Sequence, residues 1–501
     1  MIKPFKEEQA GESLVSLKQR AVRGGLAKLV GQAVNFVLRI LFVAAMARLL
    51  DPADFGLVAM VTVITGFYGL FTEAGLSTAT IQRAAITNEQ ISTLFWINLM
   101  VGVLLAFLCL LSAPVVVRFY DEPRLFWIMV VMAGGFIINA AGVQHAALLD
   151  RHLRFAIMTA IEVSCQLASI AVGISMALAG FGYWSLVAAT IASQIVFVSC
   201  VWTIAAWIPG LPRRSAGTRS MLRFGGTVTL NGLVVYVAYN LEKLLLGRFW
   251  GADVLGLYGR AYQLINIPTA NLNSAIGGVT FAALSRLQHD PPRLNSYFLK
   301  GYRLANSLTL PTTMFCALFA DDIILVLLGP KWIEATDIFR LLSPTILIFG
   351  MINPFAWLLM STGLQERSLK IALVIAPLVI TAYCIGLPFG PTGVALAYST
   401  AMMVWLVPHI FWCVHGTAIS PRDVLFAISK PLISAVLAGG VAFFAKFFIA
   451  QLNPAFLRLA VEGGVMFIVY FVTLLFVMGD KGLYLDLFRG VKGSRSAEAE
   501  V

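Results

Sequence analysis

The sequence is poor in charge, since only 12% of its 501 residues are Asp, Glu, Lys or Arg. A soluble domain carries about 25% of such residues, so this scarcity excludes a soluble globular protein. Hydrophobic residues make up 59% of the chain and gather in long runs. The runs are continuous rather than alternating, which excludes a membrane β-barrel and leaves a bundle of membrane helices.

Motifs for chemistry are also scarce. The six cysteines lack C-x-x-C spacing, and none of the five histidines has metal-ligand spacing with a partner carboxylate. The sequence has no phosphate-binding loop with a Lys-Ser/Thr pair, so we expect no direct use of ATP, no metal and no cofactor. Every loop is short, which leaves no room for a folded soluble domain.

The apolar runs predict about fourteen transmembrane helices, because roughly 20 apolar residues are needed to cross the hydrocarbon. We place about 24 of the 36 Lys and Arg residues on the side of the N-terminus and about 7 on the other side. The positive-inside rule then predicts that both termini are cytoplasmic. The net charge of +11 thus reflects orientation, and we expect no nucleic acid partner. Residues 1–22 lack an apolar run, so we expect no secretory signal.

Two stretches of the chain, 23–81 and 223–281, follow one template. Arg48, Gly56 and Leu57 recur as Arg248, Gly256 and Leu257 at an offset of 200. An even number of helices per copy predicts parallel lobes around an axis along the membrane normal, and transporters usually bind substrate between such repeats. We predict an all-α polytopic membrane protein with two pseudo-symmetric six-helix lobes and two additional C-terminal helices.

The predicted segments follow from this repeat. They are a cytoplasmic N-terminal segment (1–22), an N-lobe (23–207), a cytoplasmic linker (208–222), a C-lobe (223–415), the last two helices (416–478) and a cytoplasmic tail (479–501).

Polar residues inside the apolar helices mark a predicted cavity. On the first helix, four of them share one face, namely Lys28, Gln32, Asn35 and Arg39. Two further stripes are in register at offset 200. The first holds Thr62, Thr65, Gly69, Glu73 and Thr80, and the second holds Tyr258, Tyr262, Asn266, Thr269 and Asn273. A hydrogen-bonding seam within each lobe would give the same pattern, but equivalent stripes in both lobes favour a shared central cavity.

Three carboxylates lie inside predicted helices and are candidates for ion coupling: Glu73, Glu162 and Glu242. Glu162 shares a helix face with Gln166. Glu242 is adjacent to Lys243, so the two side chains should point about 100° apart and should not simply neutralise each other.

Three stretches resemble Wzx-type polysaccharide flippases of the multidrug/oligosaccharidyl-lipid/polysaccharide exporter superfamily. They are residues 55–58 with 71–83, residues 239–248 with 255–258, and the turn Gly180-Phe-Gly-Tyr-Trp184. The resemblance covers residues 20–415 and is closest to the branch that handles exopolysaccharide repeat units such as colanic acid. Glu stands at 73 and 242 where the family more often has Asp, so the charge is kept and the reach altered.

The resemblance implies a flippase rather than an enzyme. Its substrate would be an undecaprenyl-pyrophosphate-linked oligosaccharide, moved from the cytoplasmic to the periplasmic leaflet of the bacterial inner membrane by alternating access. The process served would be exopolysaccharide or lipopolysaccharide biosynthesis. Its other partners would be membrane lipid and other polysaccharide-assembly membrane proteins, and we expect a monomer.

The same resemblance suggests roles for the polar residues. Arg39, with Lys28 and Lys243, would attract the pyrophosphate. Glu73 or Glu242 would balance charge, while Tyr258, Tyr262, Asn266 and Asn273 would contact sugars. An ion-coupled multidrug or metabolite antiporter remains an alternative. A cavity dominated by carboxylates would favour it, but the cations inside the predicted helices are at least as numerous as the acids. A membrane polymerase or ligase is a second alternative, which would need a sizeable periplasmic loop.

Overall fold

The computed structural model describes residues 14–72, 80, 86–152, 154–212, 233, 236–449, 454–482 and 484. Side chains are described from residue 30 onward, except those of 271–276, 278, 279, 282 and 449. These residues form helices and short connections without a strand, which confirms the predicted all-α class. Contacts group the chain into two compact units, Met1–Gly259 and Arg260–Val501.

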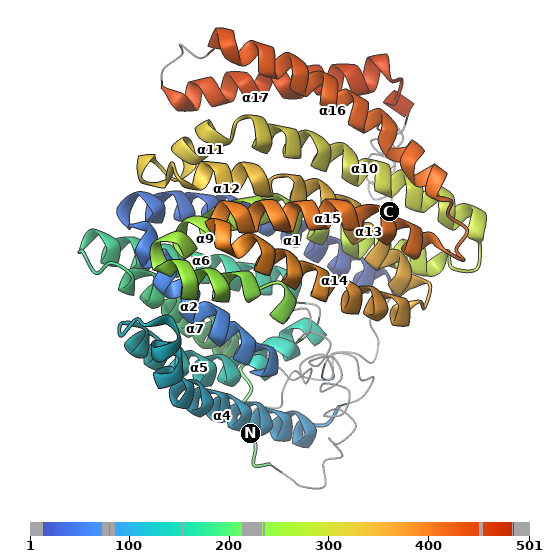
Figure 1. Ribbon diagram of the computed structural model, residues 1–501. Coiled ribbons are helices and arrows are strands. Elements are labelled where there is room, and N and C mark those ends of the chain that lie inside the picture. Colours follow the sequence, from blue (N-terminus) through green and yellow to red (C-terminus); the bar gives the residue numbers. More distant parts are fainter. Residues whose placement is uncertain are drawn as a thin grey trace. The chain divides into compact units, whose positions relative to one another are not determined.

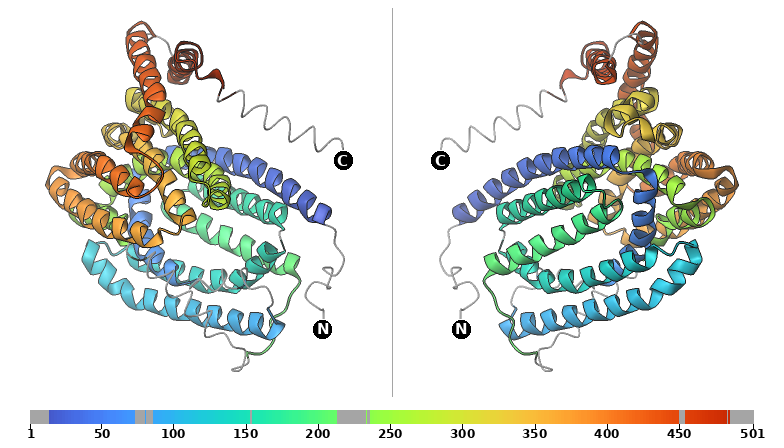
Figure 2. Two further views of the ribbon diagram at one scale, coloured as in Figure 1. Left: turned by 90° about the vertical axis from the view of Figure 1, so that its right-hand side faces the viewer. Right: turned by 90° about the vertical axis from the view of Figure 1, so that its left-hand side faces the viewer.

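Long helices in a row build the first unit. Its helices are α1 (Leu14–Leu49), α2 (Pro52–Thr72), α4 (Asn88–Tyr120), α5 (Leu125–Arg151), α6 (Phe155–Leu178), α7 (Trp184–Ala205) and the first part of α9 (Leu241–Arg286). Helix α1 packs on α6, α6 on α7, α7 on α5, and α5 on α4, a row that Figure 2 shows from both sides. Helix α2 packs on α5 and α4. The row places α6 and α7 in the middle of the unit.

Local sequence signals set the ends of α4. At its start the Thr87 hydroxyl accepts a hydrogen bond from the Gln90 N–H, and the Gln90 side chain accepts one from the Thr87 N–H. At its end Asp121 adopts the left-handed conformation, with φ of 56°. In the following turn the Arg124 guanidinium donates two hydrogen bonds of 2.8 Å to Glu122 and lowers the pKa of that carboxyl. The result is a tight hairpin between α4 and α5.

The repeated template forms a sharp break in both copies. In the first copy the break lies between α1 and α2, around Asp51, whose N–H donates to the Asp54 carboxylate at 3.2 Å. In the second copy, 200 residues later, α9 is broken at Gly251, with φ of 84° and ψ of −177°. That conformation is open almost only to glycine. The two copies therefore turn at equivalent positions.

The two corners cross each other at glycines, and all four residues of the crossing belong to the first unit. A Cβ atom on Gly56 would lie 1.8 Å from the carbonyl oxygen of Ala252. A Cβ atom on Gly256 would lie 1.9 Å from the carbonyl oxygen of Pro52. Positions 52 and 252, like 56 and 256, are equivalent in the repeat, so the two contacts are reciprocal. Backbone packed this closely leaves no room for a side chain at either glycine.

The second unit holds the remainder of α9 and eight further helices among its described residues, labelled where there is room in Figure 1. They are α10 (Pro291–Leu318), α11 (Ala320–Leu327), α12 (Ala335–Leu342), α13 (Pro344–Ser361), α14 (Gln365–Gly386), α15 (Gly390–Val414), α16 (Pro421–Ile449) and α17 (Ala455–Val472). Short turns η1 (Pro330–Trp332), η2 (Leu387–Phe389) and η3 (Thr473–Val477) complete it. Helices α10 and α11 meet at a bend of 84°. Helix α10 packs on α13 and α16, and α15 packs on α12, α13 and α14.

The helices are long and apolar enough for a membrane. Among the described residues ten helical segments pass the length and hydropathy required to cross it, or eleven if the bent pair α10–α11 counts as one span. Large apolar side chains are exposed along them, as Phe448 illustrates at 87% exposure. In a membrane, lipid would cover these side chains. The protein is therefore a multi-pass membrane protein.

Candidate functional site

The polar face predicted on the first helix lies on α1. Gln32 and Asn35 are half-buried, and Asn35 Oδ1 is buried without a hydrogen-bond partner among the described residues. Arg39 is exposed and forms no ion pair with a described residue. Lys28 is on the same helix, but its side chain lies outside the described residues. Arg39 is therefore a cation within a membrane helix that is accessible to an anionic ligand.

Glu242 and Lys243 lie closer together than their sequence predicts. Lys243 Nζ is 3.9 Å from Glu242 Oε1 and donates a hydrogen bond of 2.8 Å to Asn240 Oδ1. Glu242 is only 1% exposed. The prediction that the pair would not neutralise each other was wrong, because the long lysine side chain bends back over the first turn of α9.

The second predicted stripe, which runs from Tyr258 to Asn273, is divided between the two units. Tyr258 belongs to the first unit and is completely buried, whereas Tyr262 and Asn266 belong to the second unit and are half-buried. The side chain of Asn273 and the whole of Glu73 lie outside the described residues. The shared central cavity therefore stays a prediction.

A polar pocket lies between α5, α6 and α7 within the first unit. It has a volume of about 290 Å³ and is lined by Asn139 of α5, Glu162, Cys165 and Gln166 of α6, and Ser193, Gln194 and Phe197 of α7. Glu162 is exposed. Gln194 Oε1 is buried without a hydrogen-bond partner among the described residues. Five of the seven lining residues are polar, within helices that are otherwise apolar.

Sequence reasoning found only part of this pocket. It placed Glu162 and Gln166 on one helix face, as they are here. It missed Asn139, Ser193 and Gln194, which contribute one or two polar groups each from two other helices. The available signal was the presence of amides inside apolar runs, which is costly unless they face a cavity or each other.

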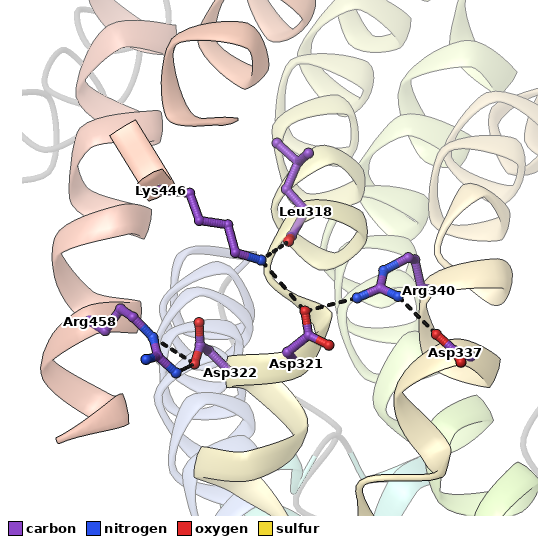
Figure 3. A network of polar contacts seen from close by, with 7 residues as sticks. All are labelled: Leu318, Asp321, Asp322, Asp337, Arg340, Lys446 and Arg458. Carbon is purple, nitrogen blue, oxygen red and sulfur yellow. Dashed lines mark hydrogen bonds and ion pairs between the residues drawn. The ribbon is translucent and has the colours of Figure 1, made fainter. Parts of the chain in front are cut away.

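A second polar cluster joins α11 and α12 to α16 and α17 within the second unit (Figure 3). Asp321 accepts hydrogen bonds from Arg340 Nη2 at 2.9 Å and from Lys446 Nζ at 3.5 Å. Asp322, 2% exposed, accepts from Arg458 Nε at 2.9 Å and also from Arg458 Nη2. These ion pairs fix the last helices to the bent pair α10–α11.

The other end of the same helices is fixed in the same way. Asp480, 4% exposed, lies 2.9 Å from Lys430 Nζ of α16 and 3.3 Å from Arg303 Nη1 of α10. Helices α16 and α17 are therefore tied to α10 and α11 at both ends. Lys430, Lys446 and Arg458 thus take part in ion pairs within the second unit.

Comparison with known sequences finds a match to a family of polysaccharide biosynthesis proteins. Residues 45–337 match the model of the family described as polysaccharide biosynthesis protein. The lipopolysaccharide biosynthesis protein WzxC of Escherichia coli (strain K12) is 26% identical over 398 residues, 78% of this chain and 80% of the relative. The succinoglycan biosynthesis transport protein ExoT of Rhizobium meliloti (strain 1021) is 23% identical over 463 residues, 91% of this chain and 93% of the relative.

Comparison with solved structures finds the same fold in flippases and transporters. The lipid II flippase MurJ in its inward closed conformation matches with a TM-score of 0.76 at 12% identity, over 91% of this chain and 99% of that one. An inward-facing multidrug resistance transporter of the MATE family, in the MOP superfamily, matches with a TM-score of 0.60 at 16% identity, over 77% of this chain and 97% of that one. The relatives and neighbours whose names state an activity are transporters and a flippase, not enzymes.

Proposed function

The chain belongs to the polysaccharide biosynthesis protein family, and from this premise we propose that it is a flippase for lipid-linked oligosaccharides. Its substrate would be an undecaprenyl-pyrophosphate-linked repeat unit, carried from the cytoplasmic to the periplasmic leaflet of the bacterial inner membrane. The process served would be exopolysaccharide or lipopolysaccharide biosynthesis. Both termini would be cytoplasmic, and one chain would supply the whole path.

The observation that carries the proposal is the crossing of the two repeat copies at Gly56 and Gly256. Repeats related by an axis along the membrane normal support alternating access, in which one repeat rocks against the other around a fixed site. The fold shared with a lipid II flippase and with MATE transporters supports the same mechanism.

Arg39 is the residue that we assign to the pyrophosphate. Arginine binds phosphate through several hydrogen bonds, and Arg39 is exposed without an ion pair among the described residues. Lys28 would assist it from the same helix. Lys243 is a weaker candidate than the sequence predicts, because it already contacts Glu242 and Asn240.

An ion-coupled antiporter is the second candidate, favoured by the fold shared with multidrug transporters. Such a transporter would use Glu162, which lies exposed in the polar pocket. A membrane polymerase or ligase receives no support from the described residues or from the relatives.

Accumulation of lipid-linked repeat units tests the proposal. A strain lacking the gene is grown with a labelled sugar precursor, and the undecaprenyl-linked units are located by their accessibility from the periplasm. Build-up in the cytoplasmic leaflet with loss of surface polysaccharide is the expected result. Unchanged polysaccharide with altered resistance to cationic compounds would favour the antiporter, and periplasmic build-up of unpolymerised units would favour an enzyme.

A further inference from the structure

Helix α7 separates an apolar groove from the polar pocket. Ile191 and Ile195 line the groove, which has a volume of about 600 Å³. Ser193 and Phe197, each two residues further along, line the pocket. Two residues turn an α-helix by about 200°, so the groove and the pocket lie on opposite sides of α7. The apolar side suits lipid, and the pocket faces away from it.

The pocket holds one buried hydrogen-bonding atom, Gln194 Oε1, that has no partner among the described residues. Gln194 reaches across to α5, where a Cβ atom on Gly135 would lie 2.6 Å from Gln194 Oε1. Because Gly135 has no side chain, the Gln194 carboxamide fits against α5, yet its Oε1 has no hydrogen-bond partner among the described residues. Glu162 and Gln166 face the same space from α6.

These groups match the chemistry of a sugar. A hydroxyl group both donates and accepts, an amide offers two donors and an acceptor, and a carboxylate accepts. The ring of Phe197 adds an apolar surface on which the C–H face of a sugar can pack.

Charge and size narrow the ligand further. Among the described residues the lining carries one carboxylate, Glu162, and neither Lys, Arg nor His, so it disfavours a diphosphate or a uronic acid. In the part of the chain that the structure describes, no group of three or more His, Cys, Asp or Glu residues is placed to hold a metal ion. A volume of about 290 Å³ is at the lower end for small-molecule sites, which suits one sugar ring rather than a chain.

We propose that the pocket between α5, α6 and α7 binds a single uncharged sugar residue of the transported saccharide. This inference rests on the proposed function and adds a subsite to it. The diphosphate is bound elsewhere, and the sugar residue in the pocket distinguishes a glycosylated carrier lipid from a bare one.

The test compares two lipids on the purified full-length protein. The probes are bare undecaprenyl pyrophosphate and the undecaprenyl-pyrophosphate-linked repeat units extracted from the strain that lacks the gene. Binding is followed by tryptophan fluorescence. The wild-type protein should bind the glycosylated lipid about tenfold more tightly, because each neutral hydrogen bond contributes a several-fold gain in affinity.

Matched variants then test whether the pocket causes the preference for the glycosylated lipid over the bare lipid. The double substitution Gln166→Leu with Gln194→Leu should remove the preference and keep the affinity for the bare lipid. Ser164→Ala should keep it, because the Ser164 hydroxyl lies on α6 outside the pocket and donates to the Ala160 carbonyl at 2.9 Å. An unchanged preference in the double variant, or an equal loss for both lipids, would overturn the inference.

A second measurement applies if the double variant does not fold. Ser193→Cys is placed in a protein whose six cysteines are replaced by alanine, and its reaction with a polar methanethiosulfonate is timed. The glycosylated lipid should slow this reaction at least about fivefold, as occupation of the pocket by the sugar requires. Bare lipid and sodium chloride should not slow it. Protection by sodium chloride alone would identify a cation site and overturn the sugar subsite.

Failure of this inference differs from failure of the proposed function. If the strain without the gene accumulates no lipid-linked units and keeps its polysaccharide, the flippase function is wrong. If it accumulates them while the pocket variants behave as wild type in binding, the function stands and the sugar subsite is wrong.

Discussion

The glycine crossing gives the most direct test of the duplicated framework. In Gly256→Ala, the new Cβ atom would lie 1.9 Å from the Pro52 carbonyl oxygen and 3.2 Å from the Gly56 nitrogen. An ordinary contact begins at 3.4 Å, so the two helices must separate by about 1.5 Å. The obstacle is backbone on both sides, so rotation of a side chain cannot relieve it. Overpacking of this kind costs about 1–3 kcal/mol, occasionally more.

Gly259→Ala is the matched control on the same helix. A Cβ atom on Gly259 would meet nothing within 4 Å. Alanine raises the helix propensity at both positions by about 1 kcal/mol, so this gain cancels between the two variants. The difference in stability between Gly256→Ala and Gly259→Ala then equals the cost of overpacking at Gly256, about 1–3 kcal/mol.

Thermal unfolding of the purified variants measures this difference, and restoration of surface polysaccharide in the deletion strain measures transport. Gly256→Ala should melt at a lower temperature than Gly259→Ala and should transport poorly, because the corner must open for the new methyl group. Gly56→Ala should behave like Gly256→Ala, since the contact is reciprocal. Equal melting and equal transport for Gly256→Ala and Gly259→Ala would refute the reasoning.

Four further substitutions, one of them a matched control, test the charged residues. Arg39→Ala should reduce surface polysaccharide about tenfold or more while changing the stability by less than about 0.5 kcal/mol, because the side chain is exposed; wild-type polysaccharide would remove Arg39 from the site. Arg458→Met should lower the stability measured by thermal unfolding by about 3–5 kcal/mol, because it leaves Asp322 buried without its ion-pair partner. Arg340→Met is the control and should lower the stability by about 0–1 kcal/mol, because the Arg340 side chain is 39% exposed. Similar losses of stability in the two variants would contradict this prediction. Asp480→Asn should lower the melting temperature, because Lys430 and Arg303 lose the anion that they share and the Asp480 side chain is only 4% exposed. An unchanged melting temperature would show that these ion pairs do not hold α16 in place.

Much of the framework could be predicted because a duplication leaves a record in the sequence. The offset of 200 residues placed Gly56 and Gly256 at equivalent positions in the two helices, and the break at Gly251 is equivalent to the one at Asp51. Charge distribution and apolar runs likewise predict a polytopic helical protein, because hydrocarbon admits few other structures. What the offset could not give was the contact itself. That two glycines touch the opposite backbone depends on how the two corners cross.

The candidate site was harder to predict, because its groups come from separate helices. Asn139, Glu162 and Gln194 are far apart in sequence, and spacing along one helix says nothing of which faces meet. The prediction that Glu242 and Lys243 would not neutralise each other failed for a related reason. Adjacent positions on a helix point about 100° apart, but a lysine has four carbons with which to turn back, and its ammonium lies 3.9 Å from the carboxylate.

The places where the two copies differ are informative about the substrate. Gly56 and Gly256 agree because both copies need the same close approach. Arg39, by contrast, has Tyr239 as its equivalent, and Glu242 has Phe42. The proposed substrate, a lipid-linked saccharide, is itself asymmetric, with a diphosphate at one point and sugars at another, so it would not meet the same charge in both copies. Arg39 is exposed and is therefore the first position to substitute when substrate contacts are sought, whereas Glu242 is only 1% exposed.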